Sequence, residues 1–167
     1  FSPDGKSLAY TAQTQTEGAW GSYNQRVWVV HLDGSGSRCL TENEDYCFEA
    51  ATLSDTKEFS SSGLLLWTKD SKKIYTNVGH HGQSQVGVID PVKGGVKILT
   101  EGRHWIAISS LGSDGKTLAV QKGDVTTMNE IGLVDATSPG AMTMLTSENH
   151  AFHEEVTTVP VKTEWLE

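Results

Sequence analysis

The feature that most constrains this chain is an internal repeat, in which the same short motifs recur three times in the same order. Each copy opens with a polar turn around an aspartate: Ser2-Pro3-Asp4-Gly5-Lys6, then Lys69-Asp70-Ser71-Lys72, then Ser113-Asp114-Gly115-Lys116. An apolar segment follows each turn, at 8–10, 74–76 and 118–120. Repetition at periods of 20–50 residues is typical of folds built from identical supersecondary units.

The second half of each copy also repeats. A segment ending in aspartate occupies 27–33, 86–90 and 131–135, and a glycine-containing turn follows it at 34–36, 94–95 and 139–140. Each copy closes with a Leu-Thr pair: Leu40-Thr41, Leu99-Thr100 and Leu145-Thr146. Glycine turns supply the positive φ angles of tight hairpins, and β-branched and aromatic residues favour strands. No segment sustains a helical apolar period.

Each copy therefore predicts a four-stranded antiparallel meander with strands a to d. In the second copy, 73–78, 85–89 and 96–100 should be consecutive strands. The equivalents are near 7–13, 26–32 and 37–41, and near 117–121, 129–134 and 141–146. Such a meander buries both faces only when it stacks radially on others of its kind. A β-sandwich is the alternative, but sandwiches do not repeat motifs.

The predicted fold is thus all-β, an incomplete β-propeller of about three four-stranded antiparallel blades. The repeats span about 1–41, 63–100 and 105–146, with an exposed insertion at 42–62 and an exit segment at 147–167. Because Phe1 is not an initiator and opens inside a turn, we expect the true N-terminus and a first strand upstream. Three blades cannot close a ring, so both ends should expose apolar sheet faces.

Composition narrows the function classes. The 167 residues are 37% hydrophobic and 20% charged, as in soluble globular domains. The net charge is −8 and basic residues do not cluster, which argues against a nucleic-acid binder. No apolar run could span a membrane. No signal peptide is recognisable, but that absence proves nothing when the true N-terminus is missing, so the location stays unknown, with the cytoplasm slightly favoured. Cys39 and Cys47 predict either two free thiols or one local disulfide, and no zinc site.

Residues 1–6, followed by Leu8-Ala9, resemble the Pro-Asp variant of WD40-like repeats, and 28–34 through Leu40-Thr41 are similar to its second half. That repeat occurs in TolB-like propellers and in the propellers of prolyl-oligopeptidase-family serine peptidases. The resemblance covers about 1–41 and 63–146, although the second copy lacks the Pro and Gly and the third lacks the Pro. The irregular spacing resembles the dipeptidyl- and acylaminoacyl-peptidase branches. The tail from 155 to 167 resembles the strand that leads into a hydrolase domain.

This resemblance implies a non-catalytic segment that gates the access of short peptides to a hydrolase domain of the same polypeptide. The catalytic serine of that family lies in a Gly-x-Ser-x-Gly elbow of the hydrolase domain. Residues 20–24 match the elbow only at Ser22-Tyr23, so we expect Ser22 to be a loop residue. We assign no catalytic, cofactor-binding or metal-binding residue. The alternative is a TolB-like or stand-alone propeller that binds a protein partner, and a homo-oligomer that completes the ring is compatible with both.

Propeller topology places the b–c and d–a loops on one face. Side chains that could bind a metal ion lie in these loops: His80, His81, His104, His150, His153, Glu42, Glu44 and Asp45. A metal or ligand site there is one interpretation. Solvated loop residues are favoured, because these loops belong to different blades. Glu154-Glu155 resembles the paired glutamates of dipeptidyl peptidases, although a solvated turn is favoured. Aromatic residues in strands usually pack between blades, which we expect of Trp28, Trp67 and Trp105, whereas Trp20 lies in a loop that could contact a partner.

Overall fold

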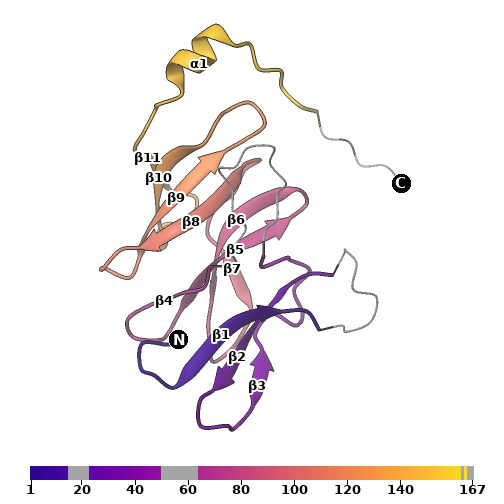
Figure 1. The fold of residues 1–167 in the computed structure, drawn as a ribbon, viewed down its shortest axis with the longest axis vertical. Helices are drawn as coiled ribbons and strands as arrows, with labels where there is room; N and C mark the ends of the chain where they lie inside the picture. Colours follow the sequence, from indigo (N-terminus) through magenta and orange to yellow (C-terminus); the bar gives the residue numbers. More distant parts are fainter. Residues whose placement is uncertain (15–22, 50–63, 163, 165–167) are drawn as a thin grey trace.

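The computed structural model describes residues 1–14, 23–49, 64–162 and 164. They form three antiparallel sheets that follow one another along the long axis of the molecule (Figure 1), and we call these blades 1 to 3. Blade 1 contains β1 (Ser7–Ala12), β2 (Arg26–His31) and β3 (Ser37–Cys39). Blade 2 contains β4 (Leu66–Trp67), β5 (Ile74–His80), β6 (Gln83–Ile89) and β7 (Val96–Ile98). Blade 3 contains β8 (Trp105–Leu111), β9 (Thr117–Gly123), β10 (Glu130–Asp135) and β11 (Met142–Met144).

The strands lie where the repeat predicts them. In blade 2, β5, β6 and β7 pair consecutively and antiparallel, and their counterparts pair in the same way in blades 1 and 3. Strand a corresponds to β4 in blade 2 and to β8 in blade 3. Blade 1 has no such strand among the described residues. The predicted meanders are therefore confirmed.

One aspartate organises each turn between strands a and b. Asp4 accepts hydrogen bonds from the Ser2 hydroxyl at 2.6 Å and the Lys6 N–H at 3.1 Å. Asp70 and Asp114 make the equivalent bonds to the backbone two residues on, both at 3.1 Å. The residue after each aspartate is left-handed: Gly5 has φ 69°, Ser71 59° and Gly115 71°. The repeated motif therefore encodes a turn that needs positive φ, which Ser71 adopts at a steric cost.

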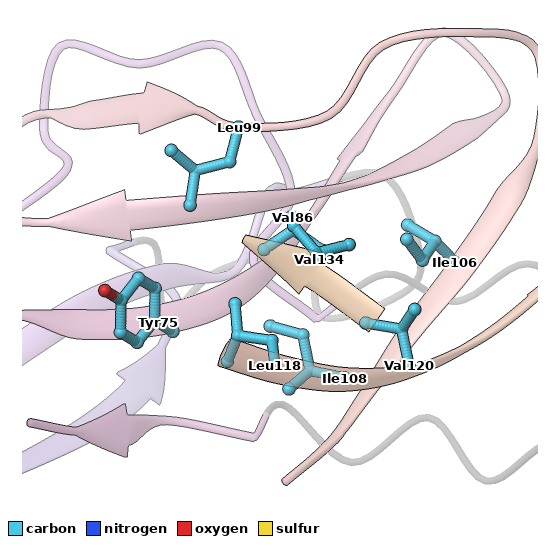
Figure 2. Close-up of a cluster of buried hydrophobic side chains, with 8 residues drawn as sticks. All are labelled: Tyr75, Val86, Leu99, Ile106, Ile108, Leu118, Val120 and Val134. Carbon is cyan, nitrogen blue, oxygen red and sulfur yellow. The ribbon is translucent and has the colours of Figure 1, made fainter. Parts of the chain in front are cut away.

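Two apolar cores form, one at each junction between neighbouring blades. Strand residues alternate between faces, so the middle blade, blade 2, buries one face against blade 1 and the other against blade 3. The core between blades 1 and 2 consists of Val27, Val29, Leu40, Phe48, Ile74, Val78 and Ile89. The core between blades 2 and 3 consists of Tyr75, Val86, Leu99, Ile106, Ile108, Leu118, Val120 and Val134 (Figure 2). Each fully buried aliphatic side chain stabilises this stack by roughly 1.5–3 kcal/mol.

We expected the insertion at 42–62 to be an exposed loop, and this expectation is wrong for residues 42–49. Phe48 is 0% exposed and belongs to the first core. Cys47 pairs with Gly79 through N–H···O bonds of 3.0 and 2.7 Å, which add this segment to the end of β5. The polar composition of this segment suggested an exposed loop, although Phe48 within it is buried. Residues 50–62 lie outside the described part of the chain. Both cysteines, Cys39 and Cys47, are free thiols, as one of the two alternatives predicted.

The exit segment also differs from expectation. It contains a short helix, α1 (His150–Glu155), with no buried residue, and the described residues from 156 onward contain no strand. The expected strand leading out of the last blade is therefore absent from 155–162 and 164. No described strand lies beside this stretch to pair with it (Figure 1). Nowhere among the residues that the structure describes is a helix long and apolar enough to cross a bilayer.

The tryptophans divide between two environments. Trp67 packs against the core between blades 1 and 2, as predicted. Trp28 does not, because its neighbours Val27 and Val29 point into that core and strand alternation turns Trp28 to the opposite face. Trp105 likewise lies on the opposite face of β8 from Ile106. The prediction of inter-blade packing is therefore wrong for these two within the described blades.

Candidate functional site

The candidate site is the end of the blades that carries the b–c hairpins and the d–a connections. In blade 2 the b–c hairpin is the two-residue turn His81-Gly82, with φ angles of 51° and 72°. Two positive φ angles in succession are typical of the type I′ turn that matches strand twist. At its base, Gly79 pairs with the preceding d–a connection and the Ser84 N–H donates to the carbonyl of His104 in the following one, at 3.2 Å. This hairpin therefore joins two d–a connections.

Near the start of strand c, each blade has one side chain that forms hydrogen bonds with the d–a connection that follows strand d of the same blade. These side chains are Arg26, Gln85 and Glu130. Each forms a hydrogen bond with the threonine of its own Leu-Thr pair, which lies 15, 15 and 16 residues later in the sequence. In blade 1 the Arg26 guanidinium donates to the carbonyl oxygens of Thr41 at 2.6 Å and Glu44 at 2.5 Å. The chemistry of the side chain varies between blades, whereas its structural task is the same.

In blade 2 this position starts a buried polar network. The Gln85 Oε1 accepts a hydrogen bond from the Thr100 hydroxyl at 2.7 Å, and its Nε2 donates to the carbonyl of Gly102 at 2.8 Å. His104 Nε2 lies 3.0 Å from the same Oε1. Burial is the main cause that lowers the pKa of His104, which favours the neutral ring with its proton on Nε2. His104 is only 8% exposed, so the expectation of a solvated loop histidine is wrong here, because hydrogen bonds to Gln85 and Ser84 hold it against strand β6.

A second buried side chain fastens blade 2 to blade 3. The Asn77 Nδ2 donates to the carbonyl of Ile106 at 2.7 Å, and its Oδ1 accepts from the N–H of Ile108 at 3.1 Å. The Ser84 hydroxyl donates to the same Ile106 carbonyl at 2.7 Å. The carboxamide of Asn77 thus replaces a peptide group beside β8. Together with the Gln85 network, it makes this junction polar and rigid at the loop end and apolar further along.

In blade 3 the equivalent position is acidic. Glu130 accepts from the Thr146 hydroxyl and from the N–H of Asn149, the latter at 2.8 Å. These hydrogen bonds, led by that of Thr146, lower the pKa of Glu130 to about 2. Beside them lies a cleft of about 320 Å³, which is lined by Gln121, Met128, Asn129, Ile131 and Asn149. Side-chain amides and two apolar residues therefore form its walls.

The histidines of this end are brought together only in part. The rings of His80 and His81 stack with centroids 3.5 Å apart, and Tyr46 meets His80 edge-on at 4.9 Å. His104 belongs to the Gln85 network, while His150 and His153 lie on α1. Within the described ranges, no group of three or more His, Cys, Asp or Glu residues is arranged to hold a metal ion.

Two of the predicted acidic residues, Glu44 and Asp45, make hydrogen bonds from the connection between blades 1 and 2. The Glu44 Oε1 accepts from the N–H of Val96 at 3.3 Å. Asp45 accepts from the Asn24 side chain at 3.0 Å, and Glu42 is exposed. Glu154 and Glu155 are exposed on α1, where a carboxylate oxygen of Glu154 lies 3.3 Å from His150 Nε2.

A serine and a histidine do meet, but as a cross-strand pair. The Ser7 hydroxyl lies 3.2 Å from His31 Nδ1, and the two residues face each other in the pairing of β1 with β2. Asp33, the nearest acid in sequence, accepts from the N–H of Ser35 at 2.8 Å and makes no hydrogen bond to His31 among the described residues. Ser22 and Trp20 fall outside the described part of the chain.

The arrangement of the blades matches known β-propellers. TolB from Acinetobacter baumannii has a TM-score of 0.60 and 24% sequence identity, over 87% of this chain and 31% of that one. The β-propeller domain of the Trilobed protease from Pyrococcus furiosus has a TM-score of 0.56 and 18% identity, over 87% of this chain and 36% of that one. The fold is that of a β-propeller segment.

A third match is a peptidase. Acylaminoacyl peptidase from Pyrococcus horikoshii has a TM-score of 0.60 and 15% identity, over 92% of this chain and 20% of that one. The structural neighbours thus include a TolB protein, the propeller domain of a protease and an acylaminoacyl peptidase. This chain spans 31%, 36% and 20% of their respective lengths. These identities establish the fold alone. No protein-family model matches the sequence, and no curated protein matches it.

Sequence reasoning missed the residues that hold the propeller segment together at this end. Arg26, Gln85 and Glu130 are a cation, a neutral amide and an anion, so a search of the repeats for identical residues does not find them. Their nearly constant distance from the Leu-Thr threonine was the available signal. Asn77 gave no signal, because its partner strand lies in another blade.

Proposed function

We propose that this chain is a non-catalytic β-propeller segment of a prolyl-oligopeptidase-family serine peptidase, where it helps to gate the access of short peptides to a hydrolase domain. The observation that carries the proposal is the backbone match to propellers of two peptidases, one of which covers 92% of this chain. A gate of this kind selects by size, because rigid walls admit a short flexible peptide and reject a folded domain.

The geometry of the loop-bearing end supports such a rigid wall. Each d–a connection is fastened by a side chain of its own blade, and the connection between blades 2 and 3 is held by buried hydrogen bonds from Gln85 and Asn77. Buried hydrogen-bond networks of this kind restrain backbone motion more than exposed ones. Residues at this end therefore keep their positions when a peptide passes.

Two measurements test the proposal. The isolated chain should not hydrolyse aminoacyl or peptidyl esters and amides, and turnover that Ser22→Ala abolishes would contradict it. The full polypeptide that carries these blades should react with a fluorophosphonate, which labels activated serines, and should cleave short peptides but not folded proteins. A full polypeptide that no fluorophosphonate labels would overturn the peptidase assignment.

The second candidate is a TolB-like or stand-alone propeller that serves as a scaffold for a protein partner. The match to TolB favours it, since that protein shares 24% identity with this chain. The fluorophosphonate experiment separates the two candidates, because a scaffold has no activated serine to label.

A further inference from the structure

His104 is the only buried histidine among the described residues, since it is 8% exposed and the other five are at least partly exposed. It lies in the d–a connection between blades 2 and 3, and the structure describes both of these blades. Its Nε2 lies 3.0 Å from Oε1 of Gln85, and its carbonyl accepts a hydrogen bond from the N–H of Ser84 at 3.2 Å. The ring and the backbone of His104 therefore both hold this connection against β6.

The partners of Gln85 fix which atom of its carboxamide faces the ring. Its Nε2 donates to the carbonyl of Gly102 at 2.8 Å, and that carbonyl can only accept. Its Oε1, which accepts from the Thr100 hydroxyl at 2.7 Å, is therefore the atom beside His104. Because Oε1 also can only accept, Nε2 of the ring carries the proton of this contact. A neutral ring with its proton on Nε2 thus satisfies the whole network.

The other ring nitrogen, Nδ1, is packed against the backbone of the same connection. Gly102 has a φ of 122°, and a Cβ at this position would lie 3.1 Å from Nδ1. Protonation of the ring would add an N–H at Nδ1, and Nδ1 has no hydrogen-bond partner within the described part of the chain. A charged ring with an unpartnered donor is disfavoured in a buried position and gains solvation by moving into water.

The charged groups around the ring do not offset this cost. Neither β6 nor β8 carries a titratable side chain. Burial, followed by the positive charge of Lys122, lowers the pKa of His104 below its ordinary value of 6.5, and the negative charge of Asp124 opposes them only in part. The titratable groups of the connection itself are exposed, and those of the b–c hairpin of blade 2 stack on each other: Glu101 and Arg103, and His80 and His81.

We propose that His104 is a proton-sensitive latch, whose protonation releases the connection at 101–104 from β6 and loosens the loop-bearing end of the junction between blades 2 and 3. Because the folded ring binds a proton less readily than the unfolded one, the contribution of the latch is complete above pH 6.5 and decreases as the pH falls below it. The hydrogen bonds of Asn77 to β8 do not titrate, so the blades stay joined while the connection opens. The latch does not require a hydrolase domain, so its failure would leave the proposed function intact.

Hydrogen exchange followed by mass spectrometry tests the latch in the full polypeptide that carries these blades. After correction for the intrinsic effect of pH, peptides covering 83–86 and 101–106 should exchange at least about threefold faster at about pH 5 than at about pH 7.5. His104→Gln keeps an N–H donor for Gln85 and cannot take up a proton, so its exchange should not depend on pH. His150→Gln, at an exposed residue of α1, is the matched control and should behave like wild type.

Two charge variants, which keep His104 in place, separate a titrating latch from a merely structural histidine. Lys122→Gln removes the charge that disfavours protonation and should move the midpoint of the exchange transition to higher pH. Asp124→Asn removes the charge that favours protonation and should move the midpoint to lower pH. Midpoints in this order support the latch. Wild-type exchange that does not depend on pH, a pH dependence that survives in His104→Gln, or a midpoint that neither charge variant shifts would each overturn it.

Discussion

Replacing each Leu-Thr threonine by valine removes one hydroxyl and nearly preserves the shape of the side chain. The hydroxyl oxygens of Thr41, Thr100 and Thr146 accept hydrogen bonds of 3.0, 2.9 and 2.9 Å from the backbone N–H at the start of strand c. Thr41 is 1% exposed and Thr100 is 4% exposed, while Thr146 is partly exposed. The repeat therefore provides the same substitution in two dry environments and one wet environment.

The expected loss in the free energy of unfolding depends on whether the backbone N–H finds another hydrogen-bond partner after the substitution. A buried N–H without a partner costs about 1–3 kcal/mol, and this applies to Thr41→Val and Thr100→Val. Thr100 also donates to Gln85, so its substitution loses a second bond and about 1 kcal/mol more. Thr146 likewise donates a second bond, to the Glu130 carboxylate. Water can replace both of its bonds, because Ile131 is 39% exposed and Thr146 is itself partly exposed, so Thr146→Val should cost less than about 1 kcal/mol. The predicted order of destabilisation is Thr100, then Thr41, then Thr146.

Urea unfolding measures these differences through the midpoint and the slope of the transition. Thr143→Val is the matched control, because Thr143 is exposed on β11, and it should shift stability by no more than about 0.5 kcal/mol. The reasoning would be refuted if Thr41→Val and Thr100→Val unfolded at the same urea concentration as the control. An equal loss at all three repeat positions would refute the distinction between covered and uncovered blades.

Three further predictions concern turns. Ser71→Gly should raise the free energy of unfolding by less than about 1 kcal/mol in urea titrations, because the relief of a left-handed φ of 59° outweighs the loss of the exposed hydrogen bond that the Ser71 hydroxyl accepts from the Asp4 N–H at 3.1 Å. Gly94→Ala should destabilise the chain more than Gly5→Ala, since both glycines have positive φ but only the Cβ at Gly94 would lie 2.7 Å from a carbonyl oxygen, that of Leu40; equal midpoints would contradict this. Hydrogen bonds, led by that of Thr117, lower the pKa of Asp114 to about 2. Its contribution is therefore complete above the ordinary pKa of 3.8 and is lost as the pH falls toward 2. Asp114→Asn should flatten the dependence of stability on pH in that window.

Much of the blade structure could be read from the chain because its determinants are local. The aspartate turns and the glycine positions constrain φ and ψ within a few residues, so the hairpins follow from short motifs. The insertion was misjudged because one buried aromatic residue, Phe48, outweighs the polar residues around it. The exit strand was misjudged because a strand requires a partner, and none of the described strands lies beside 156–162.

The candidate site was less accessible to sequence reasoning. His81 was correctly placed in the b–c turn of blade 2, because hairpin position follows from strand order, whereas His80, expected in the same loop, is the last residue of β5. The burial of His104 was not foreseen, since it depends on a hydrogen bond to Gln85 in another strand. Asn77 was overlooked for the same reason, as its role arises only where β5 meets β8.

The sequence by itself determined the number of repeats, the order of strands and the turns, because these depend on backbone preferences encoded within each repeat. Only the tertiary structure decided which face of each strand became core. Strand alternation offers Val27 and Trp28 opposite faces, and the choice between them depends on which neighbouring blade is present. The same holds for Leu40 and Leu145, which share a motif but are 3% and 57% exposed. Burial is a property of what packs against a residue, and no local motif specifies that.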